Sequence, residues 1–193
     1  MTDNSNTDTT VELVRSFKAG DTQAFNRLVL LYQTRIYNMA LNYVKNTEEA
    51  KDLTQDIFVN IYRAIPTLRE ESKFQAWLYK IAVNKCRNRY NKLNRRGFFQ
   101  NQSLDDDNST IQLKGEKEPE RTLEKEEIVK RVRSGIDSLK KSERDILILR
   151  DLQDLSYEEI GTILEMPLGT VKSKLNRARA SLKTQLKSIY REL

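Results

Sequence analysis

Apolar residues recur at three- and four-residue steps along most of this chain, which is the spacing of amphipathic helices. In the clearest run, the residues expected to share one buried side are Phe25, Leu28, Tyr32, Ile36, Met39 and Tyr43. Gly20 and Asp21 precede this run, as a helix-ending glycine and an N-cap residue do. Similar patterns predict helices over residues 11–20, 46–65 and 72–94, and no stretch shows a convincing strand alternation.

The C-terminal half repeats the helical pattern after an interruption. Residues 97–120 show no periodicity and are rich in polar and acidic side chains, so we expect a flexible linker. Further helices are predicted over residues 121–139, 142–152, 156–165 and 170–190. Residues 1–10 are polar and are expected to form a disordered tail. The predicted fold is therefore all-α, with two small helical domains at residues 11–96 and 121–193.

Residue composition removes several classes of function. The chain has one cysteine, Cys86, and no histidine. This excludes zinc sites built on Cys and His, disulfides within the chain, and catalysis by Cys–His or Ser–His pairs. Cys86 falls within an apolar helical pattern, so we expect it to be buried. The carboxylates show no recognisable metal spacing, and we expect no enzyme activity, cofactor, metal or small-molecule substrate.

The sequence also lacks signals for a membrane. The starting segment, MTDNSNTDTT, has no apolar core, so it does not resemble a signal peptide. No apolar run approaches the ~18 residues of a membrane span. We therefore expect a cytoplasmic protein without membrane insertion.

Charge is unevenly distributed along the chain, which the net charge of +6 conceals. Residues 1–96 carry 16 Lys and Arg against 10 Asp and Glu, residues 97–128 carry 4 against 9, and residues 129–193 carry 14 against 9. Two basic blocks separated by an acidic one suggest two polyanion-binding modules on a tether.

Residues 155–182, LSYEEIGTILEMPLGTVKSKLNRARASL, contain two short helical patterns that meet in a turn. Ser156 and Glu159 fit a capping box for the first helix. Pro167 stops that helix, and we expect Gly169 to ease the turn. In the second helix, the apolar side predicted to pack on the core consists of Val171, Leu175, Ala178 and Leu182. This is the sequence pattern of a helix-turn-helix.

The opposite side of the second helix is basic. Its row of side chains consists of Lys172, Asn176, Arg179 and Lys183, with Ser173 and Arg177 beside it. Residues 166–191 contain seven Lys and Arg and no acid. Arg and Asn can bind base edges through two hydrogen bonds, while Lys mostly neutralises phosphate. We predict DNA contact; the alternative is a merely solvated cationic side, although such a side usually mixes charges.

A second acid-free stretch, residues 72–96, contains eight Lys and Arg. One helical stripe along it carries Lys73, Trp77, Lys80, Asn84 and Arg87. Cations for the backbone and an aromatic ring for stacking are what a nucleic-acid single strand requires. Spacing alone leaves a structural alternative equally open, in which Trp77 belongs to the core and the cations line the surface.

An acidic surface interrupts the first basic block. Its residues, which lie away from the apolar stripe of the helix predicted over residues 46–65, are Glu48, Glu49, Asp52, Gln55 and Asp56. Carboxylates oppose DNA binding, so a basic protein partner is the more plausible ligand. A solvated helix face is the alternative, and spacing alone does not decide between them.

The chain closely resembles the bacterial extracytoplasmic-function (ECF, group 4) sigma-70-family sigma factors in three segments that occur in the same order. These segments are EEAKDLTQDIFVNIYRA, FQAWLYKIAVNKCRNRY and LSYEEIGTILEMPLGTVKSKLNRARASL. Such RNA polymerase subunits have only the region 2 and region 4 domains, joined by a linker. The resemblance implies that residues 11–96 form region 2 and that residues 121–193 form region 4.

The resemblance also implies protein partners. The helix that holds Asp52, Gln55 and Asp56 would dock on the clamp-helix coiled coil of the β′ subunit of core RNA polymerase. The β flap of the polymerase and an anti-sigma factor are the other protein partners that it implies.

Promoter DNA is the remaining partner. Residues 67–72 match the loop that captures a flipped base of the non-template −10 strand, and Asn84 matches a polar residue that helps to read it. The side chains implied to support the opened strand are Lys73, Trp77, Lys80, Lys85 and Arg87. Those implied to contact the −35 duplex are Arg150, Tyr157, Thr170, Lys172, Ser173, Asn176, Arg177 and Arg179. Lys172 stands where Arg is frequent, and Asn176 where bulkier residues are common.

Two other functions compete with this expectation. A helix-turn-helix regulator that acts without being a polymerase subunit would leave residues 1–96 unexplained. A helical adaptor that binds proteins through the acidic surface would leave both acid-free stretches unexplained.

Overall fold

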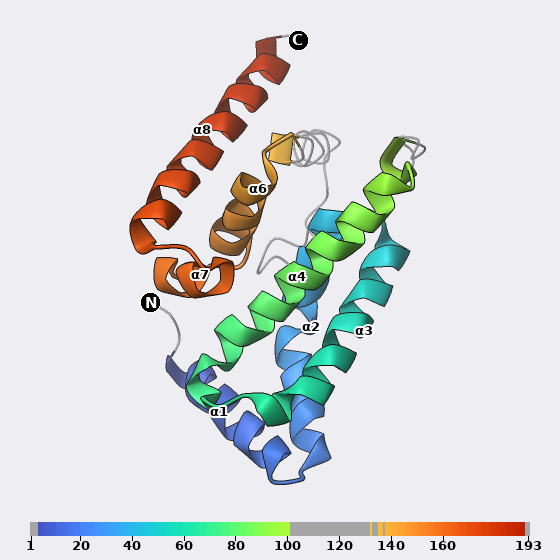
Figure 1. Cartoon of the computed structure of the whole chain (residues 1–193), viewed down its shortest axis with the longest axis vertical. Coiled ribbons are helices and arrows are strands. Elements are labelled where there is room, and N and C mark those ends of the chain that lie inside the picture. The colour runs from blue at the N-terminus through green and yellow to red at the C-terminus, as the bar shows by residue number, and fades with distance from the viewer. Residues whose placement is uncertain (1–3, 101–131, 133–134, 137, 192–193) are drawn as a thin grey trace, which may run out of the picture. The chain divides into compact units, whose positions relative to one another are not determined.

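The computed structural model describes residues 4–100, 132, 135–136 and 138–191. Within these ranges every regular element is a helix or a helical turn, and no strand occurs (Figure 1). The chain divides into two compact units, Met1–Ser109 and Thr110–Leu193. The predicted all-α class with two helical domains is therefore confirmed.

The described residues of the first unit form four helices and short 3₁₀ turns. The helices are α1 (Asn4–Lys18), α2 (Thr22–Val44), α3 (Thr47–Ala64) and α4 (Phe74–Arg95). The turns are η1 (Ile65–Thr67), η2 (Glu71–Lys73) and η3 (Phe98–Gln100). Helices α2, α3 and α4 pack against one another, and α1 packs against α2 and the turns between α3 and α4 (Figure 1).

The predicted apolar stripes form the core of this unit. All six residues predicted to share the buried side of α2 are buried, and Cys86 on α4 is buried as expected. Asp21 caps α2 by accepting a hydrogen bond from the Gln23 N–H at 2.9 Å. Asn46 caps α3 in the same way, accepting from the Glu49 N–H at 3.0 Å. The predicted cap at Asp21 therefore places the start of α2 correctly, and Asn46 marks the start of α3.

The beginning of the chain differs from the expectation of a disordered tail over residues 1–10. Helix α1 begins at Asn4 rather than at Val11, and residues 1–3 lie outside the described part. The Thr10 side chain is buried, and its hydroxyl is 3.1 Å from the Tyr32 hydroxyl. This contact with α2 anchors the part of α1 that precedes its predicted apolar stripe. The polar composition of residues 1–10 gave no indication of a helix there.

The second unit contains α6 (Lys141–Leu147), α7 (Tyr157–Leu164) and α8 (Leu168–Arg191). A π-helical turn, η4 (Ile148–Leu152), continues directly from α6. The buried side chains that hold these elements together include Ile146, Ile148, Leu155, Ile160, Val171, Leu175 and Ala178.

Two predicted segments fall largely outside the described residues. The helix predicted over residues 121–139 is described only at residues 132, 135–136 and 138–139. The linker predicted over residues 97–120 is described only at residues 97–100. There η3 packs on α4, with the rings of Phe99 and Tyr90 5.1 Å apart. In the described ranges, no helix has both the length and the apolarity needed to cross a membrane.

Candidate nucleic-acid interface

Helix α7 is defined by capping and backbone geometry at its two ends. Ser156 and Glu159 form the predicted capping box, with hydrogen bonds of 3.1 and 2.8 Å. Glu165 ends α7 in a left-handed conformation with a φ of 56°. A Cβ atom on Gly161 would lie 2.9 Å from the carbonyl oxygen of Met166, so only glycine allows the turn to fold back this closely.

The predicted role of Gly169 in this turn is wrong. Helix α8 already begins at Leu168, which places Gly169 inside its first turn. A Cβ atom there would meet nothing within 4 Å, and the positive φ of the turn belongs to Glu165 instead. The helix-turn-helix therefore tolerates a side chain at residue 169.

Helix α8 separates an apolar side from a basic one, as predicted. Val171, Leu175 and Ala178 are fully buried, whereas Leu182, the fourth residue predicted to pack on the core, is half-buried. The side chains that remain exposed include Lys172, Ser173, Asn176, Arg177 and Arg179, and Thr170 is half-buried. Because the buried residues fix the rotation of the helix about its axis, the residues of α8 that were predicted to contact DNA share one accessible surface. We call these six residues the α8 surface.

Arg179 is held by a partner that the sequence did not indicate. Its guanidinium donates two hydrogen bonds to the carboxylate of Asp151 in η4, one of them from Nε to Oδ2 at 3.1 Å. The hydrogen bond to Asp151 raises the pKa of Arg179, so the cation is retained at any physiological pH. Asp151 thus places a negative charge beside the α8 surface.

The structure brings Arg150 and Tyr157 together, two residues predicted to contact the DNA backbone. The Arg150 guanidinium carbon lies 5.2 Å from the centre of the Tyr157 ring, within the range of a cation–π contact. Nη1 of Arg150 also donates to the Leu155 carbonyl oxygen at 2.8 Å. These contacts fix the loop that enters α7.

The stripe predicted along α4 lies opposite the buried side of that helix. Asn84 is exposed, whereas Trp77, Lys80, Lys85 and Arg87 are half-buried. The Trp77 ring is 6.0 Å from that of Phe74, so it packs on the core while part of it remains accessible. Both the structural and the nucleic-acid interpretation of Trp77 are compatible with this position. Lys73 is exposed and pairs with Glu70 at 2.8 Å.

The segment between α3 and α4, residues 65–73, is organised by hydrogen bonds. The Leu68 N–H donates to the Ile65 carbonyl and the Lys73 N–H to the Glu70 carbonyl, both at 3.0 Å. Lys18, at the end of α1, donates from Nζ to the Leu68 carbonyl oxygen and to Glu71 Oε1, each at 2.6 Å. The hydrogen bond from Lys18 lowers the pKa of Glu71 below its ordinary value. Sequence reasoning missed Lys18, because nothing local links it to this segment.

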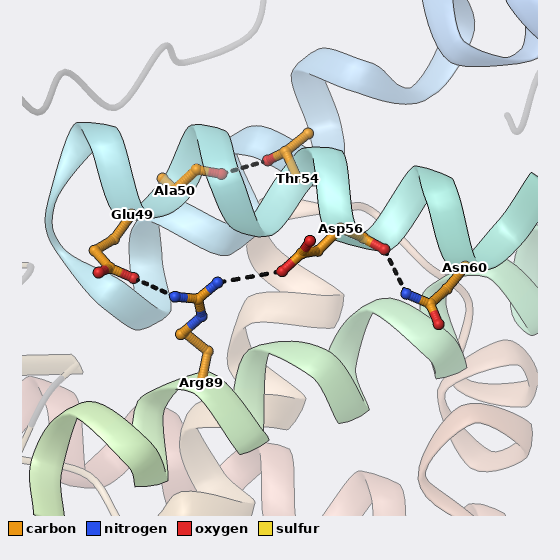
Figure 2. Close-up of polar contacts among 6 residues, drawn as sticks. All are labelled: Glu49, Ala50, Thr54, Asp56, Asn60 and Arg89. Carbon is orange, nitrogen blue, oxygen red and sulfur yellow. Dashed lines mark hydrogen bonds and ion pairs between the residues drawn. The ribbon is translucent and has the colours of Figure 1, made fainter.

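The acidic surface on α3 is also shaped by a distant residue. Asp52, Gln55 and Asp56 are exposed, as predicted. Arg89 of α4 reaches between Glu49 and Asp56, donating at 2.8 Å and 3.2 Å respectively (Figure 2). Arg89 therefore partly neutralises the charge of Asp56. In the described part of the chain, no group of three carboxylate or thiol side chains is placed to hold a metal ion.

Comparisons with known proteins agree with this arrangement. The family described as sigma-70 region 2 matches residues 28–96, and sigma-70 region 4 matches residues 130–182. The RNA polymerase sigma-H factor of Pseudomonas aeruginosa is 35% identical over 184 residues, covering 94% of this chain and 95% of that protein. The ECF RNA polymerase sigma-E factor of Escherichia coli is 35% identical over 182 residues, covering 93% and 95%.

Solved structures with the same fold include two protein–protein complexes. CnrH, solved with the cytosolic domain of CnrY, has a TM-score of 0.71 and 22% identity, and the match covers 93% of this chain and 98% of CnrH. The sigma factor RpoE of Bartonella quintana, solved with the anti-sigma factor NepR, has a TM-score of 0.63 and 23% identity, covering 86% and 98%. The family matches and the full-length relatives together show that this chain belongs to the ECF sigma factors of bacterial RNA polymerase.

Proposed function

We propose that this chain is a promoter-specificity subunit, which binds core RNA polymerase and directs initiation at promoters through both helical units. The observation that carries the proposal is the α8 surface, an exposed basic row on a helix whose other side is buried. An acid-free helix presented by a helix-turn-helix suits the major groove of duplex DNA. Polymerase performs the chemistry, and the subunit itself needs no catalytic residue or cofactor.

In this proposal, α8 binds the −35 duplex. Arg177 and Asn176 are suited to base edges, while Lys172 and Ser173 contact the phosphate backbone. Arg150 and Tyr157 approach the backbone beside the groove. The ion pair between Arg179 and Asp151 orients the Arg179 guanidinium at the edge of the same surface.

The first unit binds the opened −10 strand. The segment of residues 67–72 receives a base that has left the stack, and the exposed amide of Asn84 helps to read the strand. Lys73, Lys80, Lys85 and Arg87 supply positive charge for the phosphates, and the accessible part of Trp77 offers a stacking surface. The extruded base loses its stacking, and these contacts compensate for that loss.

Core polymerase binds the acidic surface of α3. Asp52, Gln55 and Asp56 are exposed on one helix, which suits a basic helical partner such as the β′ clamp helices. Region 4 contacts the β flap of the polymerase. The linker then holds both DNA-binding units on one enzyme, so that after one unit has bound the promoter the other binds it intramolecularly. An anti-sigma factor, as found with the structural neighbour RpoE of Bartonella quintana, is the regulatory partner, and the cytoplasm is the place of action.

Run-off transcription tests this function. The full chain, mixed with core RNA polymerase, should start transcripts at defined sites on fragmented host DNA, and core polymerase alone should not. The mapped start sites should share two sequence elements upstream. If the protein binds duplex sites tightly without polymerase and gives no defined start with it, the chain is a helix-turn-helix regulator instead.

A further inference from the structure

Lys18 connects the end of α1 with the segment between α3 and α4, far along the sequence. Its ammonium donates to the Leu68 carbonyl oxygen and to the Glu71 carboxylate, both at 2.6 Å. The side chains of Lys18 and Glu71 are only 25% and 22% exposed. Withdrawing an ammonium from water is unfavourable unless its donors find acceptors, so these two bonds hold Lys18 in one position.

The two acceptors lie on either side of the exposed part of the segment. Leu68 follows η1 and has a buried side chain, whereas Glu71 begins η2. Arg69 and Glu70, between them, are exposed. Lys18 therefore fixes both ends of a short stretch whose middle faces solvent. A surface loop fixed in this way gives up less conformational entropy when it binds a ligand.

We propose that Lys18 is a positioning residue for base capture, which holds residues 68–71 in the conformation that receives an extruded base of single-stranded DNA. This inference rests on the proposed function of the segment. Lys18 acts through the Leu68 carbonyl and Glu71 rather than by touching the base.

The experiment compares two DNA probes bound by the holoenzyme. Each is a fork-junction duplex from a promoter mapped by run-off transcription, with a single-stranded non-template −10 segment. One probe is intact, and the other carries an abasic site at the captured position. The affinity for the intact probe divided by the affinity for the abasic probe, both measured by fluorescence anisotropy, is the ratio of interest. It isolates the contribution of the base from general attraction to the backbone.

Lys18→Met should lower this ratio about three- to tenfold by raising the ordering cost of the loop, while affinity for the abasic probe changes little. Lys18→Arg keeps two donors and should restore most of the ratio. Glu71→Ala removes one of the two acceptors and should lower the ratio less than Lys18→Met does. If Lys18→Met fails to fold, Glu71→Ala provides the test. Arg27→Met removes an exposed cation from α2 and is the matched control, with an unchanged ratio.

Two results would overturn the inference, and they are distinguishable. If the wild-type holoenzyme binds both probes equally, base capture by this unit is wrong and the role of Lys18 fails with it. If the wild type prefers the intact probe and the Lys18 and Glu71 variants keep that preference, or lose affinity equally for both probes, the positioning role alone is wrong.

Discussion

The guanidinium of Arg179 on α8 donates two hydrogen bonds to the carboxylate of Asp151 in η4. Arg179 lies on the surface that we propose for the −35 duplex. A DNA phosphate and Asp151 would therefore compete for the same donors, and the carboxylate would also repel the phosphate. In the proposed complex, Asp151 would thus oppose DNA binding while it orients Arg179.

Replacing Asp151 by Asn should strengthen DNA binding because it removes this negative charge. An exposed ion pair contributes ~0.2–1 kcal/mol, so we expect affinity for duplex DNA to rise about 1.4- to fivefold. The gain should be largest at low salt and should include non-specific duplexes. Glu158→Gln, an isosteric loss of charge at an exposed position on α7, is the control. Weaker binding by Asp151→Asn would show that orienting Arg179 matters more than the repulsion.

Arg177→Ala should weaken sequence-specific binding to the −35 duplex by roughly 1–3 kcal/mol if Arg177 meets a base edge. Affinity for a scrambled duplex should fall much less, because a base contact carries specificity. The ratio of the two dissociation constants, measured by mobility shift at one salt concentration, checks this. Lys187→Ala changes an exposed cation further along α8 and should leave the ratio intact. An unchanged ratio for Arg177→Ala would exclude Arg177 from the interface with the bases.

Arg89→Met should destabilise the first unit, because it leaves Glu49 and Asp56 without the guanidinium that joins them (Figure 2). We expect the free energy of unfolding to fall by about 1–2 kcal/mol, between the values for exposed and for charge-assisted buried hydrogen bonds. Trp77 is the only tryptophan, so its fluorescence reports urea unfolding of this unit. Arg89→Lys keeps the charge but loses the planar fork, and should give an intermediate loss. Equal stability of all three proteins would contradict a stabilising bridge.

Locally encoded features of this fold were predictable, and contacts between distant elements were not. The periodicity of residues 22–44 and the caps at Asp21 and Ser156 depend on neighbours in sequence, and the structure confirms them. Gly169 shows the limit of such local reasoning, because a glycine near a proline suggested the turn while Glu165 supplies the left-handed residue.

The partners of the candidate site residues depend instead on how helices pack. Asp151 and Arg179 are 28 positions apart, and Lys18 and Glu71 are 53 apart. Arg89 was visible only as one of eight cations in an acid-free stretch. Its bridge to Glu49 and Asp56 exists because α4 packs on α3 in one register. Sequence patterns could place each side chain on a face of its helix, but they could not identify the partner side chain on another element.

Asp52→Lys combined with Gln55→Ala should abolish association with core polymerase, because it reverses a charge at the centre of the acidic surface on α3. Both residues are exposed, so the helix signal in circular dichroism should be unchanged. Co-purification with tagged core polymerase is the measurement. Glu12→Lys reverses an exposed charge on α1 and should still co-purify. Survival of the double variant in the complex would place the polymerase-binding surface elsewhere.

Asn84→Ala should impair promoter opening more than binding to an already opened promoter. Asn84 is exposed on α4, so its loss should not disturb the core. If its amide hydrogen-bonds the strand only after the duplex separates, the variant should lower open-complex formation on duplex DNA by about two- to tenfold, the size of one net hydrogen bond. On a template with a pre-melted −10 segment the defect should shrink, because strand separation no longer draws on that contact. Asn91→Ala, nearer the C-terminal end of the same helix, should open both templates normally. An equal loss of open-complex formation on both templates would show that Asn84 contributes to affinity for the single strand. It would exclude a role of Asn84 in strand separation.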